Sequence, residues 1–137
     1  SKVDRSAAYA TRHIAKNICA AGICDEILVQ ISYAIGVAEP MGIYVDTLGT
    51  SKCDMSDVNI SNVISKSIGM TPFDIENRLK LRKPIYLDTA SYGHMGRKSS
   101  KIKKNFKSSD GKNKSFDLET FTWEKLDLID EIKELIK

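Results

Sequence analysis

The chain has 137 residues, 42% of them hydrophobic and 28% charged, which suffices for one domain with a core and is too short for two. No apolar run approaches the roughly 18–20 residues of a membrane-spanning helix, and the first residues lack the apolar stretch of a secretion signal, so we expect a soluble, cytoplasmic protein with no membrane partner. The formal charge of +3 is uneven: residues 1–96 carry no net charge, residues 97–114 carry +7 and residues 115–137 carry −4.

The first predicted element is a helix over about residues 4–21. Small and apolar residues recur there every three or four positions, at Ala7, Ala10, Ile14, Ile18 and Ala21. Gly22 follows where a left-handed helix cap is expected. His13 falls on the polar side of this helix, and we expect it to be solvated.

Two strands are predicted next. Residues 26–35 are rich in branched side chains and favour a largely buried strand, and residues 43–48 favour a second. Residues 36–42, which contain Pro40, form a short connection. A connection this short predicts that the two strands pair antiparallel.

Helices follow the strands. Ser56 can cap a helix with an apolar stripe that includes Ile60 and Ile64. Another helix is expected to begin at Thr71-Pro72, because proline is well tolerated at a first helical position. The run 84–87 reads as a short edge strand, and the tail from Trp123 as a final amphipathic helix.

The residues between these last two elements differ in composition. Residues 98–115 are mostly Lys, Ser and Asn with almost nothing to bury, so we expect a mobile loop. The order of all elements predicts an α+β fold, a two-layer domain with a mixed or antiparallel sheet packed on helices.

Three cysteines, Cys19, Cys24 and Cys53, form neither a C-x-x-C motif nor a cluster with His13 or His94. Their odd number and spacing favour free thiols in a reducing compartment over disulfides or a zinc site. None has an evident cationic neighbourhood, so we expect packing residues rather than nucleophiles.

Several sequence strings carry a specific resemblance. They are SKVDRSAAYA at 1–10, AKN at 15–17, VQISYAIGVAEP at 29–40, PIY at 84–86, TASYGHMGR at 89–97 and WEK at 123–125. In this order and at this spacing the chain resembles the C-terminal domain of S-adenosylmethionine synthetase.

The resemblance implies a methionine adenosyltransferase. Such enzymes form S-adenosylmethionine from ATP and L-methionine, the sulfur attacking C5′ of ATP, and hydrolyse the tripolyphosphate left behind. Mg²⁺ and K⁺ are the implied cofactors, and fixed cations with Mg²⁺ stabilise the charge on the leaving group. The family also implies a homodimer or a dimer of dimers, with each active site built between two subunits.

The same resemblance sets the expected domain boundaries. Family members carry a glycine-rich phosphate loop, GGGAFSGKDP, just before the Ser-Lys-Val-Asp string, and the chain begins after it. We therefore expect a partial domain over residues 1–97 and 116–137, lacking its first strand and this loop, with residues 98–115 as an insertion. Alone, such a fragment should be inactive.

Three residues match family site positions. Lys2 corresponds to a catalytic lysine that approaches methionine and the polyphosphate, where an ammonium acts as a point charge. Asp4 corresponds to an acid that binds ATP and organises Mg²⁺, although a helix N-cap is an equal alternative. Ile35 corresponds to a position at the methionine and adenine end of the site, and without the resemblance it reads as a core residue.

Two further features have a structural interpretation that we favour over a functional one. His94 lies between glycines with no identifiable acidic partner, so a structural hydrogen bond is favoured over general-base work. The basic tract 98–114 holds Phe106 among its lysines, which is also typical of nucleic-acid-binding arms. We favour a solvated loop, with a non-catalytic module binding nucleic acid or an acidic partner as the alternative.

Overall fold

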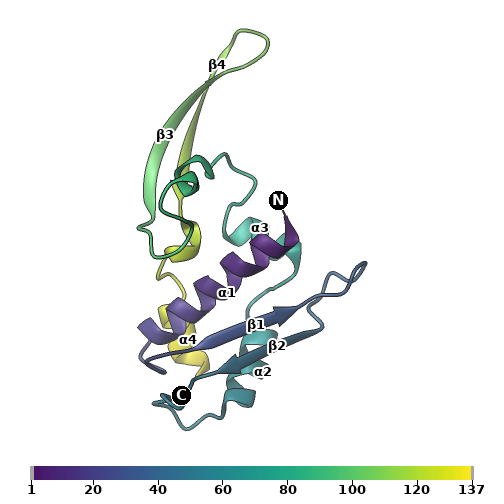
Figure 1. Cartoon of the computed structure of the whole chain (residues 1–137), viewed down its shortest axis with the longest axis vertical. Helices are drawn as coiled ribbons and strands as arrows, with labels where there is room; N and C mark the ends of the chain where they lie inside the picture. Colours follow the sequence, from purple (N-terminus) through teal and green to yellow (C-terminus); the bar gives the residue numbers. More distant parts are fainter. Residues whose placement is uncertain (1, 137) are drawn as a thin grey trace.

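The computed structural model describes residues 2–136. Its helices and strands are α1 (Val3–Ala20), β1 (Leu28–Ser32), β2 (Gly42–Asp46), α2 (Asp57–Ser67), α3 (Pro72–Arg78), β3 (Ser100–Lys107), β4 (Asn113–Thr120) and α4 (Ile129–Leu135), with 3₁₀ helices at Leu87–Ala90 and Thr122–Glu124. The strands form two antiparallel pairs, β1–β2 and β3–β4. Figure 1 shows the helices gathered around β1 and β2, while the β3–β4 hairpin extends away from them. The predicted α+β class is confirmed.

Helix α1 forms the centre of the core because its apolar positions share one face. Tyr9, Ala10, Ile14 and Ile18 are each at most 1% exposed. The helix ends before Gly22, whose φ of +82° lies in the left-handed region that glycine adopts without strain. The prediction of this helix and of its glycine cap is confirmed.

Strands β1 and β2 pair antiparallel as predicted, with Leu28 opposite Asp46 and Ser32 opposite Gly42. The prediction that the first strand is largely buried is wrong. Alternate residues of β1 face solvent, so only one face of this small sheet packs on the helices and the other is open.

The capping predictions for α2 and α3 are confirmed. The Ser56 hydroxyl accepts a hydrogen bond from the Asn59 amide at 3.3 Å. The Thr71 hydroxyl accepts one from the Asp74 amide at 3.2 Å, with Pro72 opening the helix. These bonds satisfy amide groups that have no partner within the helix.

Two predicted elements differ in the structure. The segment 84–87 pairs with no strand among the described residues, and at Leu87 the chain enters a 3₁₀ helix. The Tyr86 hydroxyl donates to the Leu81 carbonyl at 2.5 Å. The final helix begins at Ile129 rather than at Trp123. Trp123 instead lies in the second 3₁₀ helix, directly after Phe121, whose φ of +48° turns the chain inward.

The segment expected to be an irregular mobile loop is a β-hairpin. Ser100 pairs with Thr120 at its base and Lys107 with Asn113 near its turn. The turn is closed by a hydrogen bond from the Ser108 amide to the Lys112 carbonyl at 2.8 Å. Alternating apolar residues on the two strands stabilise the pairing, which composition alone did not indicate.

His13 is buried, not solvated as expected. It is 1% exposed, and its Nε2 lies 2.7 Å from an Asp127 carboxylate oxygen. The polar side of α1 is covered because the chain returns over it after the hairpin. Among the helices of residues 2–136, none combines the length and apolarity that crossing a bilayer requires.

Candidate functional site

A cavity of about 580 Å³ lies where the start of α1 meets the segment that follows β1. Its lining residues are Val3, Asp4, Tyr33, Ala34, Ile35, Gly36, Val37, Ala38 and Pro72. Two of the three predicted site residues, Asp4 and Ile35, therefore line the same hollow. The cavity wall is apolar apart from Asp4 and the tyrosine, so it can hold a ligand that is partly apolar and carries a charged group.

Asp4 is not the N-cap of α1. That position belongs to Lys2, whose side chain makes no capping bond, while Asp4 lies in the first helical turn. A carboxylate there is stabilised by the positive end of the helix dipole without closing the helix itself. The N-cap alternative is therefore wrong, and the Asp4 carboxylate stays available to a ligand.

Lys2 is exposed and does not line the cavity, but it directly precedes the cavity residue Val3. Its carbonyl accepts the first hydrogen bond of the helix, from the Ser6 amide at 2.9 Å. This bond fixes the backbone of Lys2, while its ammonium group stays free to move on a long stem.

Ile35 is fully exposed, with a relative exposure of 106%. Its interpretation as a core residue is therefore wrong for this chain. The next residue, Gly36, has φ +82° and turns the chain, and Val37 beyond it is also exposed. Two uncovered apolar side chains beside a cavity form a surface whose burial by a ligand or partner would be favourable.

Tyr33 and Pro72 are cavity residues that sequence reasoning missed. The Tyr33 hydroxyl donates to the Met70 carbonyl at 2.5 Å, which ties the end of β1 to the start of α3. Burial raises the pKa of Tyr33, although Arg78 acts against it, so the phenol remains a neutral donor. The alternation along β1 was the available signal for Tyr33, whereas nothing in the sequence brings Pro72 to this place.

A second hollow of about 470 Å³ lies beside the first, between α1 and β1. Val3, Asp4 and Tyr33 line both, and the remaining wall comes from α1 and from Leu28 to Ile31. Asp4 therefore lines two neighbouring hollows and can contact a ligand in either.

The residues around the cavity fit a magnesium ion only in a limited way. Within residues 2–136, no three His, Cys, Asp or Glu side chains gather closely enough to hold a metal ion. Asp4 is the one acid that lines the cavity. Mg²⁺ is commonly held by one or two carboxylates together with substrate phosphates and waters, so Asp4 fits the role of a single protein ligand.

His94 has the structural role that the sequence favoured. Its Nδ1 lies 2.6 Å from the Tyr9 hydroxyl, and its carbonyl accepts a hydrogen bond from Trp123 Nε1 at 2.7 Å. The Tyr9 and Trp123 rings stack with centroids 3.6 Å apart. His94 thus joins the glycine-rich turn to α1 and to the second 3₁₀ helix.

The buried Glu124 carboxylate organises an ionic cluster with two partly exposed cations of α1. It accepts hydrogen bonds from Arg12 Nε at 3.2 Å, Lys16 Nζ at 2.8 Å and the Gly96 amide at 2.7 Å. Burial alone would raise the pKa of Glu124, but these donors hold it below its usual value. The charged carboxylate fixes the C-terminal part of the domain against α1.

The cysteines behave as packing residues. Cys24 is buried, and its Sγ lies 3.9 Å from that of Cys19. Burial and the neighbouring Cys19 raise the pKa of the Cys24 thiol to about 12. The thiol therefore stays protonated near neutral pH, which makes it a poor nucleophile.

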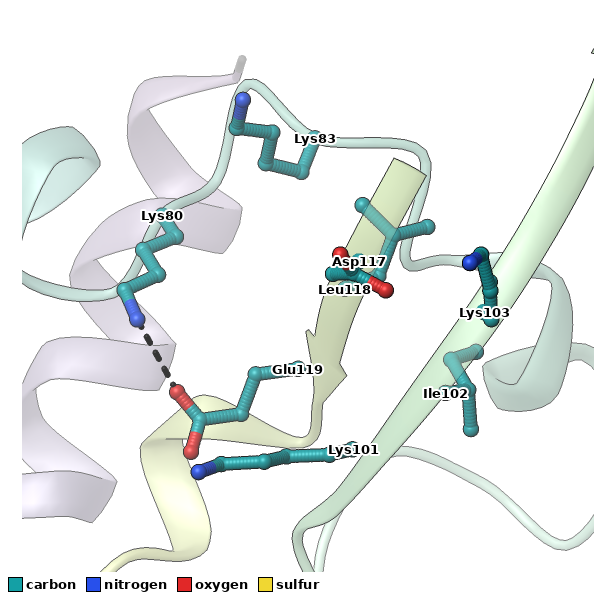
Figure 2. A pocket seen from close by; sticks show the side chains of 8 residues that line it. All are labelled: Lys80, Lys83, Lys101, Ile102, Lys103, Asp117, Leu118 and Glu119. Atoms are coloured by element: carbon teal, nitrogen blue, oxygen red, sulfur yellow. Dashed lines mark hydrogen bonds and ion pairs between the residues drawn. The ribbon is translucent and has the colours of Figure 1, made fainter. Parts of the chain in front are cut away.

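A third cavity, of about 490 Å³, lies at the base of the hairpin (Figure 2). Four lysines and two acids line it together with Ile102 and Leu118: Lys80, Lys83, Lys101, Lys103, Asp117 and Glu119. Figure 2 shows Lys80 pointing to Glu119, and their ion pair measures 3.1 Å. Glu119 also pairs with Lys125 at 3.3 Å, and Lys103 is opposite Asp117 in the strand register, so much of the positive charge at this base is compensated.

The chain is similar to known proteins in both sequence and structure. Residues 1–106 match the family model described as "S-adenosylmethionine synthetase, C-terminal domain". A Campylobacter jejuni protein described as an unusual S-adenosylmethionine synthetase superposes with a TM-score of 0.78 at 36% sequence identity, covering 98% of this chain and 30% of that one.

Two curated relatives named S-adenosylmethionine synthase show the same relation. The Cytophaga hutchinsonii protein is 62% identical over 133 residues, and the Flavobacterium johnsoniae protein is 59% identical over 133 residues. In both cases the match covers 97% of this chain and 32% of the relative. The chain therefore spans about a third of the length of these relatives.

Proposed function

The chain belongs to the S-adenosylmethionine synthetase family, and on that basis we propose that it supplies part of the ATP and methionine site of a methionine adenosyltransferase. The observation that carries the proposal is the cavity at the start of α1, where Asp4 and Ile35 meet. These two residues were assigned to the site from separate sequence strings. Their meeting on one cavity supports a shared ligand.

Each residue has a role that follows from its surroundings. The exposed Ile35 and its neighbour Val37 offer an apolar wall to the methionine side chain or the adenine ring. Lys2, on its flexible stem, offers a positive charge to the polyphosphate of ATP while the methionine sulfur attacks C5′. Asp4 would hold Mg²⁺, which supplies charge neutralisation to the leaving phosphates when bound. K⁺ remains an implied cofactor for which we assign no residue.

We further propose that the chain works within a homodimer or a dimer of dimers. One face of the β1–β2 sheet is open, and Leu28 and Tyr44 on it are 50% and 54% exposed. Covering such a face with a second copy would bury apolar surface. The free cysteines fit a reducing, cytoplasmic compartment.

A chimera tests the proposal. The C-terminal segment of the Cytophaga hutchinsonii relative is replaced by the matching segment of this chain, and S-adenosylmethionine formation from ATP and methionine is measured. We expect an active chimera, with activity falling about 100-fold in the Lys2→Ala and Asp4→Ala variants. Wild-type kinetics in both variants would show that these residues lie outside the site. We also propose that the 137-residue chain alone is inactive, and the same assay measures this.

A further inference from the structure

The β3–β4 hairpin ends in a basic tip that the proposed reaction does not use. Figure 1 shows its outer part lying far from the helices and from β1 and β2. We call residues 104–116 the hairpin tip. It carries four lysines, Lys104, Lys107, Lys112 and Lys114, and one acid, Asp110.

Two phenylalanines lie among these lysines on one face of the hairpin. Phe106 is opposite Lys114 in the strand register, and Lys104 is opposite Phe116. The two rings pack edge to face with centroids 5.8 Å apart, and Phe106 remains 41% exposed. Each ring thus has a lysine directly across the ribbon, since residues opposite each other on a strand pair share one face.

The positive charge of the tip is largely uncompensated. At the hairpin base, Glu119 binds two lysines (Figure 2). At the tip, Lys104 pairs with Asp88 at 4.0 Å and its side chain is only 19% exposed, whereas no ion pair involves Lys107, Lys112 or Lys114 in the part of the chain that the structure describes. An anionic partner would therefore meet three ammonium groups, those of Lys107, Lys112 and Lys114, without displacing existing ion pairs.

We propose that the hairpin tip binds single-stranded nucleic acid, with a base stacking on the exposed Phe106, whose ring packs on the partly buried Phe116, and with phosphates contacting the lysines. Aromatic rings interleaved with basic side chains form the usual platform for unpaired bases. A duplex presents only base edges in its grooves, which would leave the rings unused. A purely acidic polypeptide would neutralise the lysines but leave Phe106 uncovered.

Fluorescence anisotropy with a labelled 12-nucleotide oligo-dT and the 137-residue protein tests this proposal. We expect saturable binding at 50 mM salt that weakens roughly 20-fold at 200 mM, as three lysine–phosphate contacts to a single strand predict. The Lys107→Gln/Lys114→Gln variant should bind about 10-fold more weakly. The matched variant Lys66→Gln/Lys133→Gln removes the same charge from exposed positions on α2 and α4 and should bind like the original protein.

The aromatic contribution is tested separately. Phe106→Leu/Phe116→Leu keeps apolar side chains on the hairpin but removes the stacking surface, so we expect about 10-fold weaker binding. Circular dichroism checks that the hairpin remains folded. If it does not, the proposal is judged from the lysine variants alone. Three results would overturn the proposal: no binding at 50 mM salt, equal loss in the α2 and α4 control, or equal affinity for poly-glutamate of the same charge, which would indicate an acidic polypeptide instead.

Discussion

Tyr9 and Trp123 stack face to face, with ring centroids 3.6 Å apart and ring planes 3° from parallel. Tyr9 comes from α1 and Trp123 from the 3₁₀ helix that follows the hairpin, and neither is more than 1% exposed. His94 binds both, accepting or donating at the Tyr9 hydroxyl and accepting from the indole. The stack therefore closes the core between the first and last parts of the chain.

Removing the indole should strongly destabilise the domain. We expect Trp123→Ala to lower the free energy of unfolding by about 3–5 kcal/mol, because a large buried side chain is replaced by a cavity. Urea unfolding followed by circular dichroism measures this. Tyr92→Ala is the matched control, since Tyr92 is 95% exposed and its loss should cost less than about 0.5 kcal/mol. Similar midpoints for the two variants would contradict the role given to the stack.

The stability of the fold should depend on the charged form of the Glu124 carboxylate. We expect Glu124→Gln to lower the free energy of unfolding by about 1–3 kcal/mol, since the one carbonyl oxygen of a buried neutral amide cannot accept from Arg12, Lys16 and Gly96 together, and the amide NH2 would face these donors. Differential scanning calorimetry measures the loss. Glu134→Gln, at an exposed position on α4, should leave the midpoint unchanged.

The buried His13 should make the free energy of unfolding depend on pH. Burial lowers the pKa of His13 below 6.5 despite the adjacent Asp127, and its Nδ1 has no partner among the described residues. Below pH 6.5 the unfolded chain therefore binds a proton that the folded chain rejects. Stability should be complete above pH 6.5 and fall as the pH drops toward the lowered folded value, by at most about 1.4 kcal/mol per pH unit.

The variant His13→Gln isolates this effect, since glutamine can still donate to Asp127 but does not titrate. We expect its stability to vary less between pH 6.5 and 5 than that of the original chain, measured by urea unfolding at each pH. Glu124 and Asp127 also have lowered pKa values, so their contributions are lost only at more acidic pH, below about 4.5. An unchanged slope in His13→Gln would refute the assignment to His13.

The contrast between α1 and His13 shows what the sequence predicts and what it does not. Ala10, Ile14 and Ile18 share a face by local periodicity, so the helix and its buried side follow from a short stretch of sequence. The burial of His13 depends on Asp127, which lies 114 residues later in the chain. Local patterns carry no information about which distant segment covers a polar face.

The hairpin could not be predicted from the sequence, whereas part of the site cavity could. Phe116 and Leu118 lie two residues apart on β4, whereas Ile102 and Phe106 lie four apart on β3, on either side of an Asp110-Gly111 turn. The period of two that predicts a strand is therefore incomplete on β3, where Lys104 takes the place of an apolar residue. The cavity could be assembled only because family motifs name distant positions, which is how Asp4 and Ile35 were paired before the fold was known.

The open face of the β1–β2 sheet should mediate self-association. Leu28 and Tyr44 lie on it, and a lysine at each position would place charge where a second copy would bury apolar surface. We expect sedimentation velocity to show dimers or larger species for the original chain and a shift toward monomer for Leu28→Lys/Tyr44→Lys. Val58→Lys on α2, also exposed, is the control. A stable monomer of the original chain at high concentration would contradict the proposed face.

Substitution of Ile35 can distinguish a role in ligand binding from a role in folding. Its side chain is fully exposed, so Ile35→Ala should leave the thermal midpoint within about 1 °C, because it removes no buried contact. In the active chimera, the same change should raise the KM for methionine or ATP about 10-fold, because a wall of the cavity is lost. Val58→Ala, another exposed branched residue, should change neither quantity. A KM unaffected by Ile35→Ala would remove Ile35 from the site, whereas a lowered midpoint would mean that its side chain supports the fold after all.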